Sequence, residues 1–255
     1  PIRGNFHVPS NPRALAIVVH GFKGFKDWAF FPWLAEHLCD HRIVVCRFNM
    51  SRSGIGEEPE SFDRLDLFAD DTYSTQVADL VATTAHARER FGNDIPTFLL
   101  GHSRGGGVAL LAAELIPDLA GIVTWSAIGR ADRWDDATKE RWRADGFLDI
   151  ENQRTKQIMR MSTAILDDYE ANRDQLDIAA AASRLRAPLL VVHGGRDESV
   201  PAEEGHALAA TAPDASKLIV ASASHTYNAI HPLVHVPREL TYAAEVSASF
   251  IGAYA

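Results

Sequence analysis

A serine in the middle of the chain stands in a pattern typical of a catalytic nucleophile. Gly101-His102-Ser103-Arg104-Gly105 matches G-x-S-x-G. The apolar run 97–100 before it predicts a buried strand, and the composition of 108–115 after it predicts a helix. A tight turn between strand and helix strains the serine backbone, exposes its hydroxyl and points the next amide at a reacting carbonyl. The five-residue pattern is weak alone, but this context favours acyl transfer on Ser103.

A serine nucleophile needs a base, and the base needs an acid that orients it. In a strand-turn-helix context of this kind, the order along the chain is Ser, then Asp or Glu, then His. Asp197 follows the predicted strand 188–193, and His225 follows the predicted strand 217–222. All three residues should therefore lie at the carboxyl edge of one sheet, where open α/β sheets place their sites. We predict Ser103, Asp197 and His225 as a catalytic triad.

Several neighbours remain alternatives for the base and the acid, because the chain has 11 histidines. Two histidines lie further past the last strand, and two acids stand near Asp197: His231, His235, Glu198 and Glu203. Three other histidines end strands or sit in the turn, where packing or capping is expected: His20, His102 and His193.

An oxyanion hole requires two backbone amides, one after the nucleophile and one from the loop after an earlier strand. Arg104 supplies the first by position, and Phe22 in His20-Gly21-Phe22 supplies the second. Gly21 and Gly24 let that loop approach closely. The side chain of Arg104 is free to contact substrate or to lie on the surface at the helix start.

Apolar strand runs alternate with helical patterns, which predicts an α/β fold with a mostly parallel central sheet flanked by helices. The predicted strands are 2–8 at an edge, 14–20, 42–48, 97–100, 121–127, 188–193 and 217–222. The predicted helices are 31–39, 71–90, 108–115 and 240–251, whereas 57–70 shows no clear period.

The strands ending at 127 and starting near 187 are separated by more chain than an ordinary one-helix connection needs. We interpret 128–186 as a cap inserted into a core made of 1–127 and 187–255. Trp134, Thr138 and Trp142 share a helical face. The segment 147–161 is expected to form an arm or hairpin, and a second helix is expected around Ile165, Tyr169 and Leu176.

The cap is expected to wall a substrate pocket and to favour compact or aromatic acyl groups. The predicted lining residues are Trp134, Trp142 and Phe147 on the cap and Trp125 below it. Trp134 and Trp142 could instead only pin the cap to the core. The first cap helix is crowded with charges, and no apolar stretch offers a groove for a long lipid chain.

The overall composition excludes several classes of protein. With 255 residues, of which 46% are hydrophobic, the chain suits one globular domain with a full core. A net charge of −9 disfavours binding to nucleic acid. No apolar run approaches 18 residues, so no membrane span is expected. Two cysteines make no disulfide framework and no signal peptide is evident, which favours the cytoplasm, although a lost leader before Pro1 stays open.

No metal and no cofactor are expected. His231 and His235 have ligand spacing, but Pro232 and Pro237 argue against a helix there. We identify no other histidine or acid pair with ligand spacing on one element. A small-molecule ester is the expected partner, and the protein is expected to be a monomer or a homodimer.

These residues resemble the α/β-hydrolase superfamily over nearly the whole chain. Within it the chain is similar to small bacterial serine esterases of the cinnamoyl/feruloyl-esterase and dienelactone-hydrolase-like group. The resemblance rests on His20-Gly21-Phe22, Arg47-Phe48-Asn49, the run 101–106, His193-Gly194 with Asp197 and Val200-Pro201, and His225. The chain departs from the pattern of this group at two positions. Dienelactone hydrolases have a cysteine nucleophile where this chain has Ser103, and many cinnamoyl esterases have glutamine where this chain has Arg104.

The resemblance implies a Ser-His-Asp carboxylesterase acting on short-chain or aromatic, hydroxycinnamate-type esters without a cofactor. A thioesterase, an acyl-aminopeptidase or an acyltransferase would use the same triad. A non-catalytic binding protein with this fold is a weaker alternative, because such proteins often lose a triad residue and this chain has all three.

Overall fold

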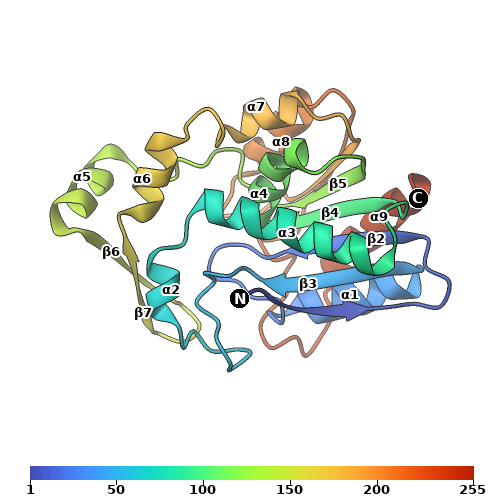
Figure 1. The fold of residues 1–255 in the computed structure, drawn as a ribbon, viewed down its shortest axis with the longest axis horizontal. Coiled ribbons are helices and arrows are strands. Elements are labelled where there is room, and N and C mark those ends of the chain that lie inside the picture. The colour runs from blue at the N-terminus through green and yellow to red at the C-terminus, as the bar shows by residue number, and fades with distance from the viewer.

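A seven-stranded sheet forms the centre of the protein, whose residues 1–255 are described by a computed structural model (Figure 1). The strand order is β1-β3-β2-β4-β5-β8-β9. Every neighbouring pair is parallel except β1 and β3. The bounds are β1 (Arg3–His7), β2 (Ala14–Val19), β3 (Ile43–Asn49), β4 (Thr97–His102), β5 (Leu119–Trp125), β8 (Leu189–Gly194) and β9 (Ala215–Val220). The predicted mostly parallel α/β sheet is confirmed.

Burial along the strands explains why their sequences are almost continuously apolar. Every residue of β2, β3, β4 and β8 is buried, as expected for parallel strands with helices on both faces. The antiparallel edge strand β1 is instead largely exposed.

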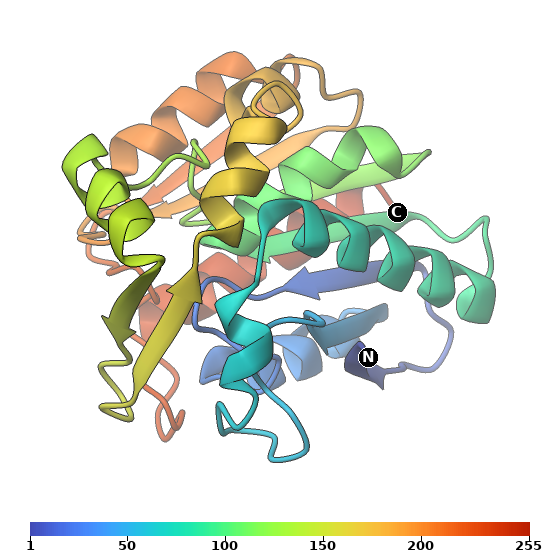
Figure 2. The same cartoon turned by 60° about the vertical axis from the view of Figure 1, so that its left-hand side comes forward.

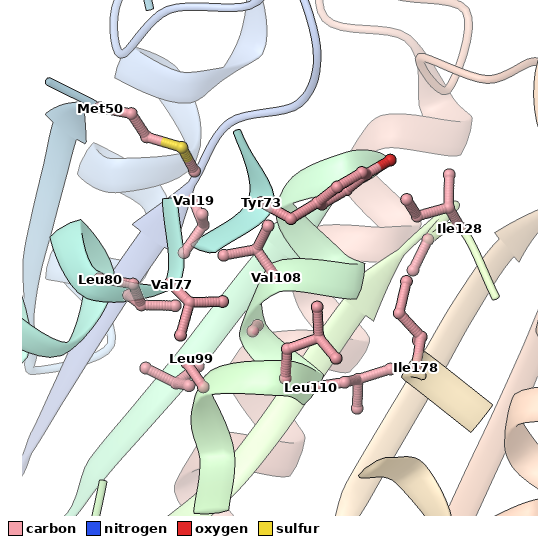
Figure 3. Packing of buried hydrophobic residues seen from close by; sticks show 14 of the residues in the cluster. Val19, Met50, Tyr73, Val77, Leu80, Leu99, Val108, Leu110, Ile128 and Ile178 are labelled. Carbon is pink, nitrogen blue, oxygen red and sulfur yellow. The ribbon is translucent and has the colours of Figure 1, made fainter. Parts of the chain in front are cut away.

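Helices cover both faces of the sheet. On one face, α1 (Phe30–Asp40) and α9 (Arg238–Ala253) pack over one core cluster. On the other face, a larger cluster lies under α3 (Tyr73–Phe91), α4 (Arg104–Ala112), α7 (Ile178–Ser183) and α8 (Ala202–Thr211). Figure 3 shows part of that cluster, with Val77 and Leu80 of α3 close to Leu99 of β4 and Val108 of α4. A 3₁₀ turn, η1 (Ala113–Leu115), follows α4.

The chain between β5 and β8 contains a group of elements that projects beyond the sheet (Figures 1 and 2). The group comprises α5 (Asp136–Asp145), the antiparallel hairpin of β6 (Phe147–Glu151) and β7 (Ile158–Ser162), and α6 (Ala164–Ala171). The short helix α2 (Leu65–Ala69) packs against β7. The hairpin matches the expectation for 147–161, while α7 packs with the core helices α4 and α8.

Local sequence accounts for the limits of α5. The Asp135 carboxylate accepts a hydrogen bond from the Thr138 amide at 2.7 Å, which caps the first turn. Gly146 follows the helix in the left-handed conformation, with φ +78°, where glycine is favoured.

The division of the chain into a core and a cap at 128–186 stays a prediction. No helix in the structure is both long and apolar enough to cross a membrane.

Candidate active site

Ser103 occupies a strained turn between β4 and α4, as the G-x-S-x-G pattern predicts. Its backbone has φ +56° and ψ −122°, which an L-residue adopts only when its surroundings enforce it. A Cβ on Gly101 would overlap the Gly105 carbonyl, and one on Gly105 would overlap the Val19 carbonyl of β2. The two glycines therefore allow the turn to pack directly on the neighbouring strand and helix, and Ser103 stays half-buried at the sheet edge.

His225 and Asp197 are joined by a hydrogen bond, with 2.8 Å between His225 Nδ1 and Asp197 Oδ2. The other carboxylate oxygen accepts the amides of Ser199 and Val200 at 2.9 and 2.8 Å. Burial alone would raise the pKa of Asp197. The hydrogen bond and the charge of His225, together with the Val200 amide, outweigh burial and hold the pKa of Asp197 below its usual value. Asp197 is thus held as a fixed carboxylate that orients the imidazole through Nδ1.

His102 links the serine turn to His225, a role that the sequence did not reveal. Its Nε2 lies 2.9 Å from the His225 carbonyl oxygen, and the two rings are 4.8 Å apart. Burial lowers the pKa of His102 to about 3, so a neutral imidazole donates Nε2–H to that carbonyl. The hydrogen bonds of His225 run to Asp197 and His102, and none runs to the Ser103 hydroxyl.

The loop after β2 lies against the serine. A Cβ on Gly21 would be 2.9 Å from the Ser103 Cβ, so only glycine permits this approach. The next residue, Phe22, contacts the Arg104 guanidinium, whose central carbon is 3.9 Å from the ring centroid. The Phe22 ring also stacks on Phe68 of α2 at 5.7 Å. The two residues predicted to supply oxyanion amides therefore touch through their side chains.

A buried polar cluster surrounds Arg104, which is only 5% exposed. Arg104 Nη1 lies 4.0 Å from Asp71 Oδ2, and that carboxylate also accepts a hydrogen bond from Gln76. One atom of each side chain is buried without a partner: Arg104 Nη1, Asp71 Oδ1 and Gln76 Oε1. Burial raises the pKa of Asp71 to about 7, although Arg104 opposes the shift. Of the two alternatives for the Arg104 side chain, the surface position is wrong, because Tyr73 of α3 and Phe22 of the loop after β2 cover it.

Asp71 should make the stability of the protein depend on pH. Its pKa is about 7 when folded and near 3.9 when unfolded, so the folded state holds the extra proton between these values. Its contribution is complete below pH 4 and is lost as pH rises through 7, by up to about 1.4 kcal/mol per pH unit. Asp71→Asn, measured by urea unfolding, should gain stability relative to wild type from pH 5 to 8. A constant difference across that range would contradict this assignment.

The rival histidines have other partners. His231 Nδ1 accepts the Ala29 amide at 2.8 Å, and its ring stacks on Trp28. His193 Nε2 lies 3.5 Å from Asp197 Oδ2, but the ring is fully buried and bonds the Val200 carbonyl at 2.9 Å. His225 is therefore the histidine best placed to act at the sheet edge.

The four predicted pocket residues do not share one surface. Trp125 is 0% exposed, packs against Phe30 and Tyr227 beneath α1 and α9, and donates its indole N–H to Ser247. Its assignment to the pocket is therefore wrong. Trp142 is 1% exposed, and Trp134 meets it edge-on at 5.1 Å, which favours the role of pinning the projecting elements. Phe147, which is 36% exposed, carries the Arg160 guanidinium over its ring at 3.7 Å.

Known proteins share this fold over the whole chain. Est1E from Butyrivibrio proteoclasticus, solved with ferulic acid, is 18% identical, with a TM-score of 0.74 over 99% of this chain and 95% of its own. The monoacylglycerol lipase of Paleococcus ferrophilus is also 18% identical, with a TM-score of 0.71 over 100% of both chains. At such identities the similarity establishes the fold alone.

The chain is also similar in sequence to known proteins. 2,6-Dihydropseudooxynicotine hydrolase from Paenarthrobacter nicotinovorans is 26% identical over 191 residues, which are 73% of this chain. The match spans only 45% of that relative's length. The family model described as serine aminopeptidase, S33, matches residues 10–144, a little over half of the chain. The chain belongs to this family, and with it to the hydrolases of the α/β-hydrolase superfamily.

Proposed function

We propose that the protein is a serine carboxylesterase that hydrolyses short-chain or aromatic esters through an acyl-enzyme on Ser103. The observation that carries the proposal is the pairing of His225 with a buried Asp197 beside the strained Ser103 turn. A base oriented by a buried acid, at the sheet edge that also holds the serine, is the arrangement that acyl transfer requires.

The proposed reaction proceeds in two steps. Ser103 Oγ attacks the acyl carbon while His225 Nε2 accepts its proton, and Asp197 stabilises the resulting imidazolium. The oxyanion accepts hydrogen bonds from the Phe22 and Arg104 amides. His225 then protonates the departing alcohol. Water, activated by the same imidazole, attacks the ester of Ser103, and the acid is released.

Arg104 should position the oxyanion loop as well as supply an amide. Losing a single oxyanion donor costs roughly 10²- to 10³-fold in kcat. A change that leaves the donor amide in place but holds it less firmly should therefore lower kcat by less. A desolvated cation–π contact is worth about 2 kcal/mol. Arg104→Met and Phe22→Leu keep both amides but remove the contact at 3.9 Å. We expect each change to lower kcat by roughly tenfold with little change in KM.

A double-mutant cycle separates this contact from general loss of packing. The Arg104→Met/Phe22→Leu variant should be little worse than either single variant, because both remove the same contact. Phe6→Leu provides a matched control, because it removes a ring whose cation–π contact is with Arg90, and it should keep the wild-type kcat. Additive losses in kcat, or losses confined to KM, would contradict a positioning role.

The acyl preference should follow from the charged surface of the projecting elements. Lys139 pairs with Asp132 at 2.8 Å, and Arg133 pairs with Glu204 at 2.6 Å. These ion pairs provide no apolar path for a long chain, whereas the partly exposed Phe147 offers an aromatic contact worth about 0.5–1.5 kcal/mol. We expect acetate, butyrate and hydroxycinnamate esters to react roughly tenfold faster than esters of ten or more carbons, measured as kcat/KM.

A substrate panel tests the reaction class itself. Esters, thioesters and aminoacyl amides of matched acyl groups should be compared, because thioesterase, acyl-aminopeptidase and acyltransferase reactions use the same three residues. Faster turnover of aminoacyl amides would favour the activity after which the family is described. The absence of turnover on all three would favour a non-catalytic binding protein.

A further inference from the structure

Three side chains meet on the side of the sheet remote from the projecting elements. His37 lies in the last turn of α1, His41 directly follows that helix, and Glu245 lies on α9, which packs beside α1 (Figure 1). His37 Nε2 is 3.7 Å from Glu245 Oε1, and His41 Nε2 is 3.9 Å from Oε2. One ligand atom from each residue lies within 4.8 Å of the others.

The side-chain atoms that face one another are two imidazole Nε2 atoms and a carboxylate. His41 Nδ1 lies 2.9 Å from the His37 carbonyl, so its proton belongs there and Nε2 carries a lone pair. His37 Nε2 is buried and has no hydrogen-bond partner. The Glu245 carboxylate adds a negative charge opposite both nitrogens. A cation bound between the three groups would give His37 Nε2 a partner and would balance the charge of Glu245.

His37 and His41 lie at the C-terminal end of α1. That end carries the negative end of the helix dipole, which favours a cation there.

We propose that His37, His41 and Glu245 bind a divalent transition metal, with Zn²⁺ as the best fit. Imidazole nitrogens and a carboxylate suit Zn²⁺, with bonds of about 2.0–2.2 Å, and three protein ligands leave a fourth position for water. A tetrahedron with such bonds has edges of roughly 3.3–3.5 Å. The separations of 3.7 and 3.9 Å run to different carboxylate oxygens, and the three ligand atoms lie within 4.8 Å of one another. Side-chain rotations that bring these atoms closer by up to about 1.5 Å would place them around one ion. The backbone carbonyl on His41 Nδ1 is the outer partner that metal-bound histidines usually have.

Two of the three proposed ligands stand close together in the sequence. His37 and His41 are four residues apart, but the predicted helix ended at residue 39 and left His41 outside it. Glu245 lies on the last helix, and only the packing of α9 against α1 brings it close. His41 is the residue after α1, so the two histidines do not share one element, and the expectation that no metal is bound stays a prediction.

A bound metal would tie the first helix to the last one. It would stabilise the folded protein by mass action, because the unfolded chain has no preformed site. Chelator-treated protein should bind Zn²⁺ at one tight site in a calorimetric titration. At a hundredfold excess over Kd, the Tm should rise by about 5 °C or more. Co²⁺ should give visible d–d absorption typical of four-coordinate nitrogen and oxygen ligands, and Mg²⁺ should have no effect.

Variants locate the site among the 11 histidines. Glu245→Gln keeps the size of an exposed side chain, so it should fold normally while losing tight Zn²⁺ binding, the Tm rise and the Co²⁺ spectrum. His37→Gln should do the same. His86→Ala removes an exposed histidine of α3, on the other face of the sheet, and should leave all three readouts unchanged. Absence of tight binding by the wild type, or its retention in Glu245→Gln, would overturn the proposal.

Discussion

Ser103→Ala should reduce ester hydrolysis by at least roughly 10⁴-fold, because removal of a triad nucleophile leaves only the oxyanion donors and substrate binding. The variant should fold normally. The serine side chain makes no hydrogen bond that its loss would break, and alanine fits the space. The measurements are kcat on a short aryl ester, together with circular dichroism and Tm.

Ser183→Ala is a suitable control, because Ser183 is an exposed serine at the end of α7. It should keep the wild-type kcat. Retention of more than about one hundredth of the activity by Ser103→Ala would point to another nucleophile or to contaminating enzyme.

His225→Ala should lower kcat by roughly 10⁴-fold or more, because both the base and the acid for the leaving alcohol are lost. His231→Ala should cost less than roughly tenfold in kcat. Its ring accepts the Ala29 amide and stacks on Trp28, so its loss should lower stability by about 1–3 kcal/mol instead. Both variants should be compared at saturating substrate and at a temperature where both are folded.

A folding control distinguishes these effects. The Tm of His225→Ala should stay close to that of wild type, whereas His231→Ala should melt earlier. If His231→Ala were the more damaging change to kcat in folded protein, the assignment of the base would be wrong.

The sequence predicted most of the fold because its strands are fully buried and continuously apolar. β2, β4 and β8 were all anticipated to within two residues at each end. The serine turn was predictable because Gly101 and Gly105 are required by close backbone contacts. The pairing of Asp197 with His225 was anticipated from their positions after neighbouring strands, and the structure places them 2.8 Å apart.

What sequence reasoning missed depends on contacts between distant segments. Trp125 follows the expected strand position, but the pleat turns its side chain toward α1 and α9, away from the serine turn. The link from His102 to His225 joins residues 123 positions apart. Asp71 was expected only as a helix start, and its burial beside Arg104 depends on how α3 packs against α4. No local pattern encodes such pairings.

The most direct test of the proposed acyl-enzyme is to locate the residue that reacts. Native protein should be treated with a fluorophosphonate, which traps an activated serine, and then examined by intact mass and peptide mapping. The account predicts one adduct per chain, on Ser103, abolished in Ser103→Ala and strongly slowed in His225→Ala. An adduct on another serine, or no adduct on folded and soluble protein, would contradict it.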